Sequence, residues 1–127
     1  MRSDELFRAL AGNGASRQIR AIISPGIEAF RRGRRERGKS APVFLSDGPR
    51  NCEVDAKCLL NLMDAFLSGD LDAIELEYVA NAIELSPTLS SSGPLVDEIL
   101  MELSNPEISQ NLTRAVVEEL SRRLHAA

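Results

Sequence analysis

Residues 58–85 constrain the fold of this chain more than any other stretch. They begin with CLLNLMDAFLSG, where apolar side chains occupy the i, i+3, i+4 and i+7 positions of one helix face. Gly69 can then adopt the left-handed backbone conformation that ends a helix. Asp70 follows as the expected N-cap of a second helix, LDAIELEYVANAIEL. The pattern predicts a tight helical hairpin, whose first apolar stripe is Leu59, Leu62, Met63 and Phe66.

Two further helices are predicted after this hairpin. Pro94 suits the first turn of a helix, where its missing N–H is not needed, and apolar residues follow it at helical spacing. Asn-Pro-Glu at 105–107 ends that helix, and Thr113 is a good N-cap for the last one. The chain has only 4 Phe, 1 Tyr and no Trp, which agrees with helices packed through aliphatic side chains. Four helices within residues 51–127 predict an antiparallel helical bundle.

The first 50 residues have a weaker pattern. Short apolar repeats predict helices on either side of Gly-Asn-Gly at 12–14. Pro25 disfavours helix at the residue before it, so we expect a separate helix to begin at Pro25 and to run into the arginines. Glycine, proline and serine at 38–49 predict a linker, with Val-Phe-Leu at 43–45 as a short extended piece. The expected fold is all-α: a basic helical segment (1–50) followed by an acidic four-helix module (51–127).

The overall charge of −4 conceals opposite charges in these two parts. Residues 1–50 contain 11 Lys/Arg and 5 Asp/Glu, a net charge of +6. Residues 51–127 contain 4 and 14, a net charge of −10. Such a division predicts either that the two parts attract each other or that each contacts a different partner.

Few residues fit a catalytic site. His125 is the only histidine and lies two residues from the end of the sequence, which disfavours a Ser-His-Asp or Cys-His arrangement and a histidine-ligated zinc. Cys52 and Cys58 form no CxxC motif, so we expect two reduced thiols. No phosphate-binding glycine loop has the required spacing. We therefore expect no enzymatic activity, no cofactor and no metal.

Carboxylates gather along the predicted hairpin. The calcium-loop pattern is absent there, and acidic residues in a first helical turn are favoured by the helix dipole alone. We interpret the group as an acidic surface that faces solvent or a partner, with a weak cation site or metal-dependent catalysis by carboxylates as the alternatives. The residues expected to face a partner are Asp64, Asp70, Asp72, Glu75 and Glu77.

The stretch FRRGRRERGKSAP at 30–42 is strongly basic in an otherwise acidic chain. It contains no interleaved aromatic residues for base stacking, and no known nucleic-acid-binding motif surrounds it. It is interpreted as a soluble helix end, a flexible linker or a brace against the chain's own acidic half, with nucleic acid or an acidic protein as alternative partners. The candidate contacts are Arg31, Arg32, Arg34, Arg35, Arg37 and Lys39.

The hairpin sequence LLNLMDAFLSGDLDAIELEYVANAIEL, residues 59–85, resembles part of a known family. Its helix, Phe-Leu-Ser-Gly turn and acidic helix are similar to the opening of some small bacterial immunity proteins of bacteriocin and contact-dependent inhibition systems. The resemblance covers about a fifth of the chain. It implies a non-catalytic inhibitor whose acidic residues, the five named above, face a basic toxin domain. The residues that carry it are Phe66, Leu67, Ser68 and Gly69.

The function predicted from these features is binding to another macromolecule. Its sharpest form is an acidic helical inhibitor, of the immunity type, that binds a basic protein. The alternative is a nucleic-acid-associated regulator that uses residues 31–39. No apolar run approaches the roughly 20 residues that cross a bilayer, and the first residues lack the apolar core of a secretion signal, so we expect a cytoplasmic protein without a membrane partner. The oligomeric state is left open.

Overall fold

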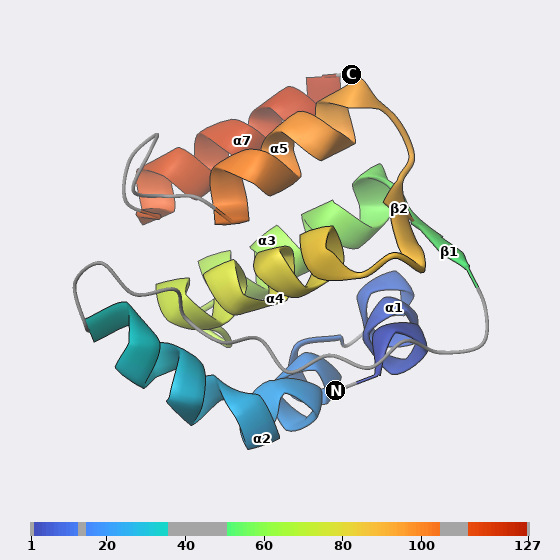
Figure 1. Cartoon of the computed structure of the whole chain (residues 1–127). Coiled ribbons are helices and arrows are strands. Elements are labelled where there is room, and N and C mark those ends of the chain that lie inside the picture. Colours follow the sequence, from blue (N-terminus) through green and yellow to red (C-terminus); the bar gives the residue numbers. More distant parts are fainter. Residues whose placement is uncertain (1, 13–14, 36–50, 105–111, 127) are drawn as a thin grey trace.

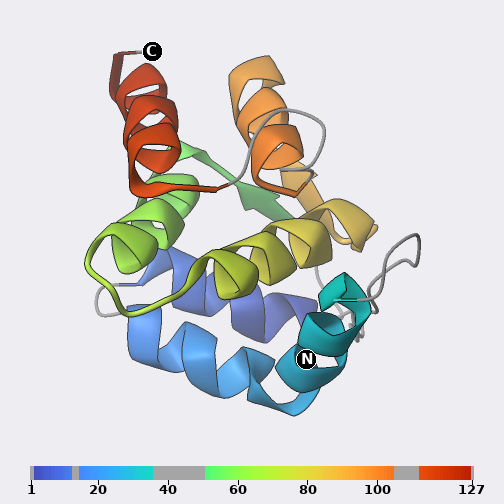
Figure 2. The same cartoon turned by 90° about the vertical axis from the view of Figure 1, so that its left-hand side faces the viewer.

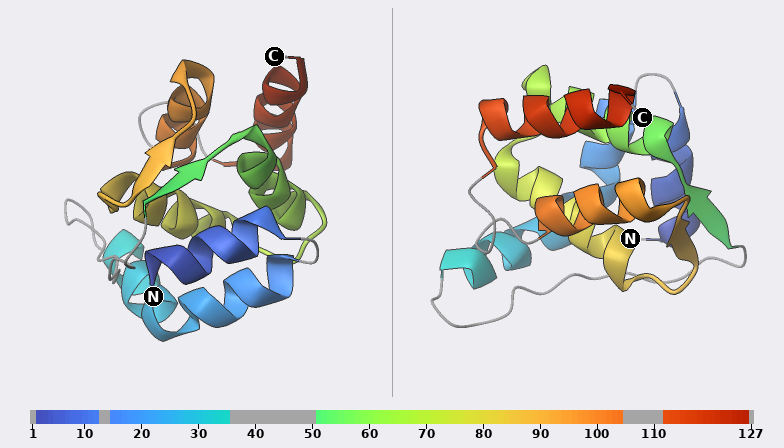
Figure 3. Two further views of the ribbon diagram at one scale, coloured as in Figure 1. Left: turned by 90° about the vertical axis from the view of Figure 1, so that its right-hand side faces the viewer. Right: turned by 90° about the horizontal axis from the view of Figure 1, so that it is seen from above.

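The helices of the protein pack in three layers (Figure 1). The computed structural model describes residues 2–12, 15–35, 51–104 and 112–126. Within each layer the two helices run in roughly opposite directions (Figures 1 and 3). The predicted all-α helical bundle is confirmed. The layers are α1 (Ser3–Ala11) with α2 (Ala15–Arg35), α3 (Ala56–Leu67) with α4 (Ala73–Leu85), and α5 (Pro94–Ser104) with α7 (Arg114–Ala126).

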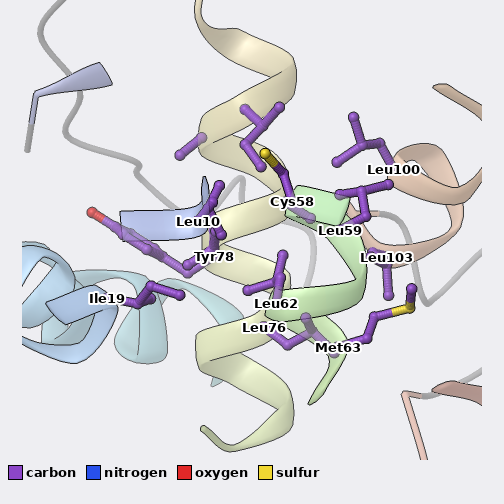
Figure 4. Packing of buried hydrophobic residues seen from close by; sticks show 14 of the residues in the cluster. Leu10, Ile19, Cys58, Leu59, Leu62, Met63, Leu76, Tyr78, Leu100 and Leu103 are labelled. Carbon is purple, nitrogen blue, oxygen red and sulfur yellow. The ribbon is translucent and has the colours of Figure 1, made fainter. Parts of the chain in front are cut away.

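One apolar core runs through all three layers. The middle layer contributes residues on both of its sides, so that α1 and α2 pack against one side and α5 and α7 against the other. Figure 4 shows Leu10 and Ile19 on one side of Leu62 and Leu76, with α5 on the other side. Buried apolar residues of segments 1–50 and 51–127 therefore belong to a single cluster, in which aliphatic side chains predominate.

Helix α2 continues through Pro25, where the sequence predicted a new helix. Pro25 has no N–H to donate to the carbonyl of Ala21, four residues earlier, which is why proline usually breaks a helix. Here the hydroxyl of Ser24 donates a hydrogen bond to that carbonyl at 3.0 Å. The axis of α2 nevertheless changes direction midway along the helix (Figure 2). The expected break is thus wrong, because a side chain replaces the lost donor and α2 bends instead of ending.

A small parallel sheet lies at one side of the helices (Figure 3). It consists of β1 (Cys52–Val54) and β2 (Leu89–Ser91), with Cys52 opposite Leu89. Neither strand was predicted, since three residues are too few to show an alternating pattern. The candidate extended piece at 43–45 lies outside the described residues. The sheet holds the start of α3 beside the connection from α4 to α5.

The helix ends follow local capping rules. Asp55 accepts a hydrogen bond from the backbone N–H of Cys58 at 3.0 Å and so caps α3. Thr113 accepts one from the N–H of Val116 at 3.3 Å at the start of α7, as predicted.

Among the described residues, no helix has the length and apolar character that crossing a membrane requires.

Candidate functional site

The turn between α3 and α4 holds the exposed part of the acidic group. Gly69 has a φ of 90°, which a residue with a Cβ adopts only under strain, and the N–H of Asp70 donates to the carbonyl of Ala65 at 2.9 Å. From α7, the guanidinium of Arg114 donates to the carbonyl of Leu67 at 2.7 Å. The turn is therefore fixed at both the backbone and its outer edge, and it displays Asp64 and Asp70 to solvent.

Helix α4 begins with a complete capping box. The carboxylate of Asp72 accepts from the N–H of Glu75 at 2.8 Å, and the carboxylate of Glu75 accepts from the N–H of Asp72 at 2.9 Å. Leu71 and Leu76, both buried, occupy the two positions of a hydrophobic staple around this cap. The N-cap is thus Asp72 and not Asp70, as the sequence had suggested. Asp70 lies in the turn, where it accepts a hydrogen bond from the hydroxyl of Ser68.

Two arginines of α2 bind the carboxylates of this capping box. Arg31 contacts Asp72 at 2.7 Å, and the nitrogen Nε of Arg20 lies 3.4 Å from an oxygen of Glu75. The hydrogen bond to Asp72 raises the pKa of Arg31 above its ordinary value. Several interpretations of the basic stretch were considered above. Arg31 fits the one in which the stretch contacts the chain's own acidic half.

Two of the five predicted partner-facing carboxylates are buried. Glu75 is 5% exposed and Glu77 is 4% exposed. Helix α4 contacts α2, α3, α5 and β2, so that positions assigned to a solvent face by spacing alone lie under neighbouring elements. The expectation of a single exposed face is wrong for these two residues. The exposed members are Asp64, Asp70 and Asp72, which we call the acidic corner.

The other members of the basic stretch divide into three groups. Arg32 is exposed to solvent. The backbone at Arg34 and Arg35 forms the last turn of α2. Arg37 and Lys39 lie outside the described residues. Among the side chains of this stretch that the structure describes, Arg31 is the one that contacts carboxylates of the protein.

Cys58 and His125, the candidate catalytic residues, lie in different surroundings. Burial raises the pKa of the Cys58 thiol to about 11, so this thiol stays protonated near neutral pH and is a poor nucleophile. His125 is exposed near the end of α7. No group of three or more His, Cys, Asp or Glu side chains in the described ranges is arranged to hold a metal ion.

Sequence reasoning missed Arg20 as a partner of the acidic helix. Arg20 and Arg31 are eleven residues apart, which is close to three full turns and places them on the same face of α2. Each directly follows a buried apolar residue, Ile19 or Phe30. This spacing could have identified Arg20, together with Arg31, as a contact of the acidic helix.

Comparisons with known proteins assign no relative to this chain. No family model matches it, and neither a curated protein nor a solved structure matches it with significance. Support for a function therefore comes from the residues of the site itself.

Proposed function

We propose that this protein is a non-enzymatic, cytoplasmic binding protein whose acidic corner contacts a basic protein partner. The observation that carries the proposal is the rigid exposure of Asp64 and Asp70 beside the capping box of α4. A glycine turn, an arginine contact from α7 and two reciprocal cap bonds all fix this short segment. A backbone held in this way loses little conformational freedom when a cationic partner arrives.

The charge of the surrounding chain supports the same partner chemistry. Segment 51–127 has a net charge of −10, and complementary charge increases the rate of association and disfavours acidic competitors. The form we favour is inhibition of a basic toxin domain, as in immunity proteins. The support for it is the resemblance of residues 59–85, together with the acidic corner at the turn within that stretch.

The test compares two double variants that remove the same charge. Asp64→Asn with Asp70→Asn removes two of the three charges of the acidic corner, whereas Glu53→Gln with Asp97→Asn neutralises two exposed residues of β1 and α5 toward the other end of the molecule. The probes are basic proteins encoded by neighbouring genes, toxin domains first, with binding rates measured by biolayer interferometry. We expect the first variant to lower the association rate about tenfold and the second to change it little. Equal effects of both variants contradict the proposed contact surface.

A second function has one observation in its favour. Arg32, among the last described side chains of α2, is exposed to solvent, so this part of the basic stretch is accessible to phosphate groups. If this stretch binds nucleic acid, the chain must bind duplex DNA or single-stranded RNA at low salt, with affinity that falls steeply as salt rises. Arg32→Gln must then weaken that binding. Absence of binding by the intact chain at about 50 mM salt rejects this alternative.

A further inference from the structure

The second half of α2 is anchored to α4 by two neighbouring side chains. We call residues 26–33 the arm. Phe30, which is 2% exposed, packs edge-on against the ring of Tyr78 with centroids 5.0 Å apart. The next residue, Arg31, makes the 2.7 Å contact with Asp72. An aromatic residue followed by an arginine thus covers an aromatic and a carboxylate on α4.

The arm joins the rest of α2 at a weak point of the helix. Pro25 cannot donate the backbone bond to Ala21, so one of the hydrogen bonds that normally cross this position is absent. The hydroxyl of Ser24 that replaces it belongs to the first half of the helix and does not tie the arm to that half. The bend of α2 is visible in Figure 2. The two halves of the helix are therefore connected less firmly than in an unbroken helix.

The contact between the arm and the acidic corner is partly exposed to water. The side chain of Arg31 is 25% exposed and that of Asp72 is 49% exposed. An ion pair in such a position is weak and salt-dependent. Arg31 also lies 3.7 Å from Glu28 on the arm itself, so it keeps a carboxylate neighbour if the arm leaves α4.

We propose that the arm is an autoinhibitory segment that covers part of the surface where the partner binds: Asp72 of the acidic corner and Tyr78 of α4, while Asp64 and Asp70 stay exposed. In the closed form Phe30 and Arg31 cover Tyr78 and Asp72. When the arm swings away about Pro25, these two residues become accessible to a partner segment of the same chemistry, an aromatic residue beside an arginine. This inference rests on the proposed function, since it assigns regulation to the same acidic corner.

The first measurement is hydrogen exchange of backbone amides, which needs no partner. Arg31→Gln removes the ion pair, and Arg32→Gln removes an exposed neighbouring arginine as the matched control. We expect Arg31→Gln to increase the population of the open arm, and hence the exchange of amides 27–33, about fivefold. Amides 17–24 of the same helix and the Arg32→Gln variant should exchange as in the unaltered chain. Unchanged exchange of the arm in Arg31→Gln overturns the proposal.

The second measurement is binding of a fluorescein-labelled peptide that copies residues 24–35, with a peptide carrying alanine at the positions of Phe30 and Arg31 as control. Because only the open form binds, the apparent Kd should fall by the same factor of about five in Arg31→Gln. Asp72→Asn keeps an N-cap residue and should open the arm equally, but it should not gain affinity because the carboxylate is lost. This variant separates opening of the arm from mere loss of structure.

The outcomes distinguish this inference from the proposed function. If the peptide binds the unaltered chain and Arg31→Gln equally, and binding is lost in Asp64→Asn with Asp70→Asn, the acidic corner binds cations but the arm does not mask it. The autoinhibitory inference is then wrong and the proposed function stands. If no variant binds the peptide although exchange shows an open arm, the acidic corner is not a cation-binding surface, and both proposals fail.

Discussion

The two outer layers of the bundle contact the middle layer in different ways. Between the α1–α2 layer and α4, pairs of opposite charge cross the interface, Arg20 with Glu75 and Arg31 with Asp72. In the α5–α7 layer, the guanidinium of Arg123 pairs with Glu98 and Glu102 within the same layer. Three hydrogen bonds between this layer and α3 or α4 pair at most one charged group with a neutral one: the amide of Asn81 with the carbonyl of Ser104, the hydroxyl of Ser104 with the carboxylate of Glu84, and the guanidinium of Arg114 with the carbonyl of Leu67.

This difference explains part of the uneven charge along the chain. The basic first segment and the acidic hairpin attract each other where α2 meets the start of α4. Some of their opposite charges are therefore paired with each other within the fold. In the α5–α7 layer, Arg114, Arg122 and Arg123 each pair with a carboxylate of the same layer. Perturbing ionic groups should therefore alter the docking of α2 on α4 more than the docking of α5 and α7.

The largest expected effect comes from the apolar anchor of α2. Phe30→Ala removes a buried ring from the contact with Tyr78 and should lower the free energy of unfolding by about 3–5 kcal/mol. Leu103→Ala, at a fully buried position of α5, should cost about 2–5 kcal/mol. Urea unfolding followed by far-UV circular dichroism measures both. Phe30→Leu, which retains most of the apolar volume, is the control and should lose less.

A small effect of Phe30→Ala would contradict the view that the second half of α2 is firmly packed on α4. If this variant lost less than about 1 kcal/mol while Leu103→Ala lost its full amount, the second half of α2 would contribute little to the core. The interface between the α1–α2 layer and α4 would then depend on the first half of α2 and on α1 alone.

The helices of segment 51–127 were predictable because their signals are local. Apolar spacing, Gly69 and Pro94 identified three of them, and Thr113 identified the start of the fourth. The cap at Asp72 was also readable, since Asp72 and Glu75 have the capping-box spacing, although Asp70 was preferred. The sequence alone was therefore sufficient to predict this cap.

The errors at Pro25 and at the buried carboxylates have other causes. A general rule about proline was overridden by the hydroxyl of Ser24, one residue away. The burial of Glu75 and Glu77 depends on how many elements surround α4, and this number is set by contacts distant in sequence. The periodicity of apolar residues within a single helix does not reveal how many elements surround that helix.

The second prediction compares Glu75, whose ion pair joins two layers, with Glu98, whose ion pair stays within one layer. Glu75→Ala removes half of the capping box and the partner of Arg20, and should lower the free energy of unfolding by about 1–2 kcal/mol. Glu98→Ala removes a largely exposed partner of Arg123 and should stay within about 0.5 kcal/mol. The same urea experiment measures both. Equal losses would show that crossing an interface gives an ion pair no special importance here.

The third prediction concerns the cap of α3, which has no arginine partner among the described residues. The hydrogen bond from the N–H of Cys58 lowers the pKa of Asp55 below its ordinary value of 3.8. The ionised cap therefore stabilises the fold above that pH, and the contribution is lost as pH falls through the lowered pKa. Asp55→Ala should cost about 1 kcal/mol at neutral pH, and the difference from the unaltered chain should shrink below about pH 3.8.

Asp55→Asn tests the assignment of this pH dependence. Asparagine caps a helix without a titrating group, so its difference from Asp55→Ala should stay nearly constant with pH. Unfolding curves at several pH values between neutral and acid give all three stabilities. A constant difference between the unaltered chain and Asp55→Ala down to the lowest pH would contradict the lowered pKa.

The smallest expected effect belongs to the α5–α7 layer. Arg123→Gln removes two ion pairs whose carboxylates, on Glu98 and Glu102, are 59% and 34% exposed, so the loss should be about 0.5 kcal/mol. At 1 M salt, where the screening length is about 3 Å, most of this difference should disappear. Hydrogen exchange of α2 should not change, because these pairs do not reach the α1–α2 layer. Faster exchange in α2 would mean that the two outer layers are coupled through α4. The two layers would then differ in the kind of contacts they make, but their stabilities would not be independent.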